Sequence, residues 1–259
     1  MKPKIILTFD LEEFDLPLEY NCPISEELQF RISNEGLLRL VDLLNLHNVK
    51  ATFFTTGNFC EKNPESIKTL SENHEIGSHA YYHSRFDKEF IIRSKRIIEI
   101  TSGKRVKGFR MPLLQKIDYD KLMQAGYEYD SSINPTFLPG RYNHFRVSRT
   151  PYKIANTGIT EFPVSVSPVI RFPLFLLSFK NLPLFLYRCF CNSAIRQDQF
   201  LHIYFHIWEF AKIDQFKIPG YVRKPNGDRY IKKFEQLINY LKRKGEFVTV
   251  SEFLRSYRF

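Results

Sequence analysis

Two histidines stand four residues apart in the segment Ile76–His83, at His79 and His83. One turn of helix would place both imidazoles on the same side of the chain. Neutral imidazole is a good ligand for zinc and related divalent ions. The spacing therefore predicts two nitrogen ligands on one metal, although two histidines on a surface turn share it and need no metal.

A cluster of carboxylates ends the first apolar run, at Asp10, Glu12 and Glu13. A carboxylate at the end of a barrel strand can complete a metal site with two histidines and leave positions open for water and substrate. In an ideal strand Asp10 and Glu12 share one face, so both could address one water. An acid-rich helix N-terminus is the alternative interpretation, and it needs no metal.

A third histidine, His206, ends the apolar run that begins at Leu201, and Trp208, the only tryptophan, follows closely. An imidazole at a strand end near a metal suits a general acid, because its unperturbed pKa lies near neutrality. A core histidine with satisfied hydrogen bonds is the alternative.

The elements that must position these side chains alternate between strand-like and helix-like segments, a pattern typical of parallel strands joined by helices. A helix is expected around residues 35–46. Eight runs read as strands, several with a polar end, and predict one barrel domain spanning residues 1–259 with its chemistry at the strand C-termini. They are Lys4–Asp10, Ala51–Gly57, Glu75–His79, Gly108–Met111, Tyr127–Asp130, Glu161–Val166, Leu201–His206 and Phe247–Val250.

Five short motifs occur in an order that resembles the polysaccharide deacetylase family, which includes chitin and peptidoglycan deacetylases. Each is unspecific alone, but the five are collinear and spread over most of the chain. They are Thr8-Phe9-Asp10, His79-Ala80-Tyr81-Tyr82-His83, Gly108-Phe109-Arg110-Met111-Pro112, Tyr129-Asp130-Ser131-Ser132 and Tyr204-Phe205-His206.

The resemblance implies a deformed (β/α) barrel of seven or eight mainly parallel strands and a bound divalent metal, zinc above all. It implies that His79 and His83 bind this metal and that Asp10 is the catalytic base. Arg110 would orient the Asp10 carboxylate, and His206 would be the general acid.

Further roles follow from the same resemblance. Asp130 would pair with His206, fix its tautomer and favour its protonated form. Tyr81 and Trp208 adjoin the motifs and could contact the sugar, and a backbone amide near Tyr81 could help to hold an oxyanion. Core packing is the alternative for both aromatic side chains.

The first motif departs from the common family pattern of two adjacent aspartates, the second of which binds the metal. Leu11 stands at that second place and cannot be a ligand. A subgroup that resembles this chain has the metal carboxylate one residue later, which points to Glu12. Glu13 remains a fallback ligand if the strand has already turned.

The composition bears on which kinds of binding partner and which kinds of cysteine site are expected. The formal net charge is +10, but no basic run is dense enough to predict nucleic-acid binding. The four cysteines form no CxxC pair, so neither a disulfide framework nor a structural zinc site is expected. Residues 136–160, rich in Pro, Gly, Asn and Arg, are expected to form a long excursion of the kind that serves as a lid or binding segment.

Residues 172–191 are very apolar, but Lys180, Pro183 and Arg188 interrupt them. We therefore expect a buried or half-buried helix rather than a bilayer span, with peripheral membrane contact as the alternative. The opening residues lack the apolar region of a signal peptide, which favours a cytoplasmic location, extending to peripheral contact at the inner membrane face.

The sequence thus predicts a metal-dependent hydrolase that removes N-acetyl groups from an amino sugar of a polysaccharide or of its lipid-linked precursor. Two alternatives stay open. A catalytically inactive barrel could bind a glycan, as the altered first motif suggests. An amidase could act on a non-sugar C–N bond, because related barrels carry similar motifs.

Overall fold

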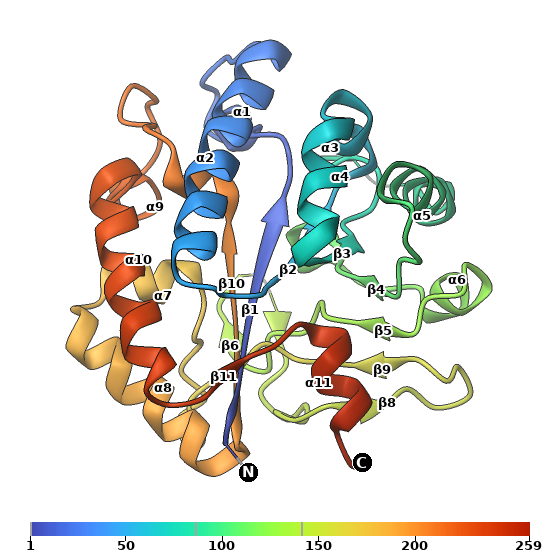
Figure 1. The fold of residues 1–259 in the computed structure, drawn as a ribbon, viewed down its shortest axis with the longest axis vertical. Helices are drawn as coiled ribbons and strands as arrows, with labels where there is room; N and C mark the ends of the chain where they lie inside the picture. The colour runs from blue at the N-terminus through green and yellow to red at the C-terminus, as the bar shows by residue number, and fades with distance from the viewer. Residues whose placement is uncertain (1, 86, 141) are drawn as a thin grey trace.

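The computed structural model describes residues 2–85, 87–140 and 142–259 and is built around a curled, mostly parallel sheet (Figure 1). Eight strands follow one another in the order β10-β1-β2-β3-β4-β5-β9-β8, and β11 pairs with β1. All pairings in this sheet are parallel except that of β8 with β9. Its strands are β1 (Lys4–Leu11), β2 (Thr52–Thr55), β3 (Glu75–Ser78), β4 (Gly108–Phe109), β5 (Tyr129–Asp130), β8 (Tyr152–Lys153), β9 (Thr160–Glu161), β10 (Phe200–His206) and β11 (Glu246–Phe247).

The predicted fold class is confirmed, since each of the eight expected runs overlaps a strand of this sheet, by one residue only for β9 and β11. The segment that follows β9 reaches β10 at the other side of the sheet. The Ser165 backbone N–H, beyond β9, donates to the His202 carbonyl in β10 at 2.8 Å, and the His202 N–H donates to Ser165 Oγ at 2.9 Å. The sheet therefore curls into a barrel that is only partly closed, with β1 and β10 upright in Figure 1 and β4, β5, β9 and β8 fanning to the right.

The strand register sets up the chemistry. Leu11 pairs with Thr55, Thr55 with Ser78, and Ser78 with Phe109, so these residues form one row across β1 to β4. Because the strands are parallel, the residues that follow this row leave the sheet at the same edge. On the other side of β1, Asp10 pairs with His206 of β10. Segments far apart in sequence are thereby brought to one end of the barrel.

Helices cover the outside of the sheet (Figure 1). The longest begins at Glu26, earlier than the predicted start near Glu35, because Ser25 Oγ caps it by accepting from the Leu28 N–H at 3.3 Å. The helices are α1 (Leu16–Glu19), α2 (Glu26–Leu46), α3 (Gly57–Lys62), α4 (Pro64–Asn73), α5 (Glu89–Ser102), α6 (Tyr119–Gln124), α7 (Leu176–Asn181), α8 (Leu184–Asp198), α9 (Gly220–Arg223), α10 (Gly227–Lys242) and α11 (Val250–Ser256), with 3-10 turns η1 (Pro112–Leu114) and η2 (Ile207–Phe210).

The apolar segment 172–191 forms α7 and most of α8. Leu176, Phe179 and Lys180 of α7 are buried, as expected for a barrel helix, and the Lys180 ammonium lies 2.8 Å from Glu209 Oε1. Over the described ranges of the chain, no helix is both long enough and apolar enough to cross a membrane.

The excursion over residues 136–160 contains a small antiparallel hairpin of β6 (Phe137–Leu138) and β7 (Tyr142–Asn143), followed by β8.

Gly36 of α2 shows how tightly the helical layer packs on the sheet end, since a Cβ there would lie 2.2 Å from the Ile207 carbonyl oxygen in η2.

We expect Gly36→Ala to destabilise the protein by about 1–3 kcal/mol, because the helix must move away from the turn that follows His206. Gly220→Ala is the matched control, since a Cβ there meets nothing within 4 Å. Urea unfolding of both variants checks the expectation, and equal stabilities would contradict it.

Candidate metal centre and active site

Glu12, His79 and His83 converge at the barrel end, and all three side chains are buried. Glu12 follows β1, and the histidines lie in the loop after β3. Glu12 Oε2 is 3.1 Å from His79 Nε2 and 3.5 Å from His83 Nε2. Each residue offers one donor atom, and the three atoms lie within 4.8 Å of one another. Two imidazoles and one carboxylate are a common donor set for a divalent metal with open positions.

The other ring nitrogen of each histidine already has a partner. His79 Nδ1 lies 2.9 Å from the Arg110 carbonyl oxygen, and His83 Nδ1 lies 2.7 Å from Asp15 Oδ1. A carbonyl or carboxylate oxygen only accepts, so Nδ1 donates in both rings. Both Nε2 atoms therefore face Glu12, and in the neutral form of each ring they carry the lone pair that metal binding requires.

The local electrostatics fit a cation between these atoms. Burial alone would raise the pKa of Glu12, but the neighbouring His83 and His206 and the bond with His79 hold it well below its usual range. Burial alone would lower the pKa of His83, but Glu12 and Asp15 raise it to about 10. Without a cation, a proton on His83 is what reconciles a buried carboxylate with facing lone pairs.

The loop from His79 to His83 is not the helical turn that the four-residue spacing predicted. No residue of this loop is helical, and Ala80 has a φ of 55°, which interrupts any right-handed turn. The loop is held instead by the start of α3, where the Gly57 N–H donates to the Ala80 carbonyl at 2.9 Å and the Asn58 N–H donates to the Tyr81 carbonyl at 2.9 Å.

Glu13, the fallback ligand, is directed elsewhere. Its carboxylate accepts from Thr56 Oγ1 at 2.8 Å and from Asn58 Nδ2 at 3.2 Å. Burial raises the pKa of Glu13. Glu13 thus joins the first strand to the start of α3, and Glu12 is the carboxylate that faces the histidines.

Asp10 lies beside this triad and is held by Arg110, whose Nη1 donates to Asp10 Oδ1 at 2.8 Å. Arg110 is completely buried. Its Nε donates to the Ser131 carbonyl at 2.9 Å, and its Nη2 donates to Thr8 Oγ1 at 2.9 Å. The predicted contact of Arg110 with Asp10 is therefore present, and the other donors fix the guanidinium.

His206 faces the carboxylates from β10. Its Nε2 is 3.8 Å from both Asp10 Oδ2 and Glu12 Oε1. Its ring stacks on Trp208 at a centroid distance of 5.0 Å and an angle of 13°. The His206 N–H donates to Glu209 Oε2 at 3.2 Å, and Glu209 is itself held by the buried Lys180.

The predicted pair of Asp130 with His206 is not formed. Within the described part of the chain, His206 Nδ1 has no hydrogen-bond partner. Asp130 instead accepts from Ser132 Oγ at 2.8 Å and pairs in register with Glu161 of the adjacent strand. Ser132 Oγ also accepts from the Met111 N–H at 2.8 Å. Asp130 therefore supports the loop that carries Arg110.

The two predicted sugar contacts have different outcomes. The Tyr81 ring turns away from the metal centre, with its hydroxyl bonded to Glu61 and the Arg93 guanidinium 3.9 Å from the ring centroid. The Tyr81 ring is buried and is not among the residues that line the cavity described next. Trp208 lines the cavity described next, and its Nε1 donates to Glu12 Oε1 at 3.2 Å, so it orients the carboxylate.

A cavity of about 340 Å³ opens over these groups. Asp10, Glu12, His79, His83 and His206 lie in its wall. The remaining wall is mostly apolar and aromatic, and is made of Leu16, Tyr20, Met111, Leu113, Leu114, Leu138, Pro139, Tyr142, Phe175, Leu176, Leu177, Tyr204, Trp208, Tyr221 and Val222, with Glu19. The pocket can therefore hold a small, partly apolar group against the candidate metal.

Three residues of this site escaped the sequence analysis. Asp15 orients His83, and Lys180 and Glu209 support the turn after His206. Asp15 lies among the acids that follow the first strand, but nothing in their spacing distinguishes an orienting carboxylate from a ligand. Only Lys180 could have been noticed in the sequence, because a lysine inside a very apolar run needs a buried acidic partner.

The buried pair of Asp130 and Glu161 yields a pH prediction. Burial, and then the neighbouring Asp130, hold the pKa of Glu161 well above its usual range. The folded state then binds more protons than the unfolded state above about pH 4.5, so the unfolding free energy falls as pH rises towards the folded pKa.

We expect Glu161→Gln to make the unfolding free energy less dependent on pH, by up to about 1.4 kcal/mol per pH unit. Glutamine has nearly the same shape as glutamate but does not ionise. The exposed Glu72→Gln is the control and is expected to follow the parent protein. Denaturant unfolding between about pH 5 and 8 measures the slopes, and equal slopes for Glu161→Gln and the parent would refute the assignment.

Comparisons with known proteins agree with this site. Residues 1–129 match the family model described as polysaccharide deacetylase, and residues 131–255 match one described as a domain of unknown function (DUF3473). The two meet inside the sheet, where β5 pairs with both β4 and β9.

Among curated relatives, a peptidoglycan deacetylase of Helicobacter pylori is 27% identical over 38% of this chain and 37% of its own length. A peptidoglycan-N-acetylglucosamine deacetylase of Bacillus cereus is 38% identical over 29% of this chain and 30% of its own length. The chain thus spans about a third of the length of the curated relatives it matches.

Solved structures share the fold. An allantoinase has a TM-score of 0.65 at 16% identity, covering 97% of this chain and 89% of that one. A CE4 family pseudoenzyme from Bacillus anthracis has a TM-score of 0.54 at 16% identity, covering 97% of this chain and 65% of that one. These structures show the fold alone. The matched family model and the deacetylase relatives show that the chain belongs to the polysaccharide deacetylase family.

Proposed function

We propose that this protein is a metal-dependent hydrolase that removes the N-acetyl group from an amino sugar of a glycan. One observation carries the proposal. The Nε2 lone pairs of His79 and His83 face the Glu12 carboxylate because both Nδ1 protons are engaged elsewhere. Asp10 and His206 lie next to this triad and supply a base and an acid.

The reaction consumes one water and yields acetate and a free amine. A divalent cation held by Glu12, His79 and His83, which we propose to be zinc, would make water more acidic and polarise the acetamide carbonyl. Asp10, oriented by Arg110, takes a proton from the attacking water. His206 delivers a proton to the nitrogen as its bond to the acetyl carbon breaks. The Tyr81 backbone amide is proposed to donate to the developing oxyanion.

The substrate remains part of the proposal. The named activities of the relatives act on peptidoglycan, which supports an N-acetylated glycan. A polysaccharide and its lipid-linked precursor carry the same acetamide. The apolar wall of the cavity can accommodate the acetyl methyl group.

Two alternative functions differ from this proposal in the products that they predict. The fold likeness to a pseudoenzyme supports a barrel that binds glycan without hydrolysis. The likeness to an allantoinase supports an amidase on a non-sugar amide. Acetate release from N-acetylated oligosaccharides and ammonia or carboxylate release from small cyclic and linear amides, measured on the same metal-loaded sample, separate the three.

We expect Glu12→Gln to lose the metal, because the anionic ligand between the two imidazoles is gone. Glu13→Gln is the matched control and should retain it, since Glu13 bonds to Thr56 and Asn58. Metal content after dialysis, measured by atomic emission, decides between them. Metal loss in Glu13→Gln alone would reverse the ligand assignment.

We expect Asp10→Asn to keep the metal and lose turnover by about 10²–10⁴-fold, the usual contribution of a general base. Acetate release and metal content are measured on one sample. Full activity in Asp10→Asn would refute its role as the base.

We expect Asp15→Asn to lower metal affinity by about 10–100-fold, because an amide orients His83 less firmly than a carboxylate does. Asp42→Asn on α2 serves as the surface control. Competition with a chromogenic chelator measures both, and unchanged affinity in Asp15→Asn would show that its bond to His83 is dispensable.

A further inference from the structure

Charge is unevenly distributed along the chain. Between Ser131 and Gln197 the only acidic residue is Glu161, which is fully buried. The same stretch contains eight basic residues, Arg141, Arg146, Arg149, Lys153, Arg171, Lys180, Arg188 and Arg196. Arg141 lies outside the described residues. This quarter of the chain therefore has no exposed carboxylate of its own. Of its cations, Lys180 is buried against Glu209, and Arg149 pairs with Asp198 just beyond the stretch.

Two turns of this stretch meet at the surface. The first is closed by the Ser167 N–H donating to the Phe172 carbonyl at 2.9 Å. Its tip is apolar, with Val169 86% and Ile170 63% exposed. Arg171 ties this turn to the β6–β7 region, because its Nη1 donates to the Val147 carbonyl at 2.6 Å.

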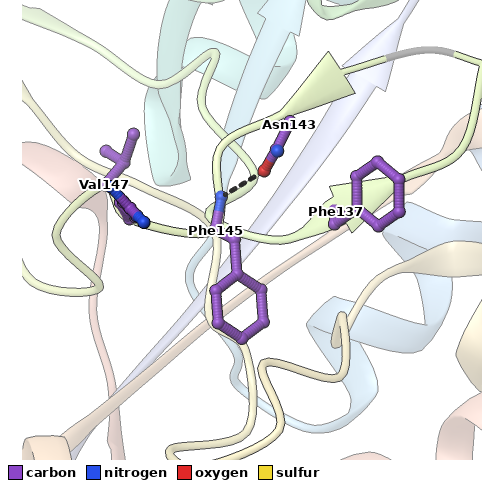
Figure 2. A pocket seen from close by; sticks show the side chains of 5 residues that line it. Phe137, Asn143, Phe145 and Val147 are labelled. Carbon is purple, nitrogen blue, oxygen red and sulfur yellow. Dashed lines mark hydrogen bonds between the residues drawn. The ribbon is translucent and has the colours of Figure 1, made fainter.

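The second turn presents aromatic rings. Phe137 and Phe145 are exposed and line an open cavity of about 710 Å³ with Asn143, Arg146 and Val147. Figure 2 shows both rings at this cavity and the Phe145 N–H donating to Asn143 Oδ1 at 3.3 Å. The Arg171 guanidinium lies 5.6 Å from the Phe145 ring centroid. We call Phe137, Phe145, Arg146, Val169, Ile170 and Arg171 the apolar-arginine surface.

This surface adjoins the active-site cavity. Leu138, Pro139 and Tyr142 of the β6–β7 hairpin line the cavity over the candidate metal, whereas Phe137 and Asn143 of the same hairpin line the open one. One short hairpin therefore forms a wall of both.

We propose that the apolar-arginine surface docks on a bilayer that contains anionic phospholipid. Exposed aliphatic and aromatic tips can enter the boundary between headgroups and acyl chains while arginines meet lipid phosphates. The proposal goes beyond the hydrolase function and does not depend on it. Docking would bring the active-site cavity close to glycans at a membrane surface.

The charges and shapes favour lipid over other occupants. A second copy of the chain would bring a net charge of +10 and the same basic face, which repel. A glycan prefers flat rings and hydrogen-bonding groups, whereas the most protruding residues, Val169 and Ile170, have neither. The proposed surface also differs from the segment 172–191 suggested by hydropathy, although the two are close in sequence.

The test is flotation of the full chain with vesicles of phosphatidylcholine alone or mixed with phosphatidylglycerol. We expect binding to the mixed vesicles that weakens with salt, and at least a tenfold loss of binding in Val169→Asp/Ile170→Asp. Ile100→Asp is the matched control, because Ile100 is 72% exposed on α5, and it should bind as the parent does. Turnover of a short soluble substrate should be equal in all three proteins, so failed docking and failed hydrolysis are read separately.

Four outcomes would overturn the proposal. The parent protein could fail to bind anionic vesicles at low salt, or the double variant could bind as well as the parent. Phe185→Asp on α8, where Phe185 is 69% exposed, could abolish binding instead and move the contact to the segment 172–191. A raised KM for an N-acetylated oligosaccharide in the double variant, without vesicle binding by the parent, would make the surface a glycan site.

Discussion

The constraint on which the site depends is that two imidazole nitrogens and one carboxylate face one another in the buried end of the barrel. His79 and His83 give their Nδ1 protons to the Arg110 carbonyl and to Asp15, so both Nε2 atoms face Glu12. Such an arrangement is unfavourable unless positive charge lies between the atoms. The pKa of His83, raised to about 10 by Glu12 and Asp15, has the same cause: negative groups surround a buried nitrogen and favour a positive charge there. The fold therefore builds a place for a cation before any cation binds.

The sheet supplies this arrangement through its register. Leu11, Ser78 and Phe109 lie in one row of parallel strands, so Glu12, His79 and Arg110 leave the sheet side by side although they are far apart in sequence. Arg110 joins two functions, since its carbonyl orients His79 while its guanidinium holds Asp10. On the opposite side of β1, the pairing of Asp10 with His206 sets the proposed base and the proposed acid next to each other. A shift of one strand by one residue would separate these groups.

Much of this could be predicted from the sequence, because parallel strands buried on both faces are strongly apolar and end in polar residues. The eight strand positions and the convergence of polar residues at one end of the barrel belong to that part. The Arg110–Asp10 contact is implied only by the resemblance to the family. The choice between Glu12 and Glu13 could not be made, because it depends on where β1 turns and on the side chains of Thr56 and Asn58. The surroundings of Asp130 depend on Glu161 of a neighbouring strand, and those of Tyr81 depend on Glu61 and Arg93. Such features are set by tertiary packing, which no local pattern encodes.

X-ray absorption at the metal edge of the zinc-loaded protein tests the central claim most directly. The account predicts scattering from two imidazoles with nitrogens at about 2.0–2.1 Å and from a carboxylate oxygen at about 2.0–2.2 Å. A spectrum without two imidazoles, or a protein that takes up no zinc, would contradict it.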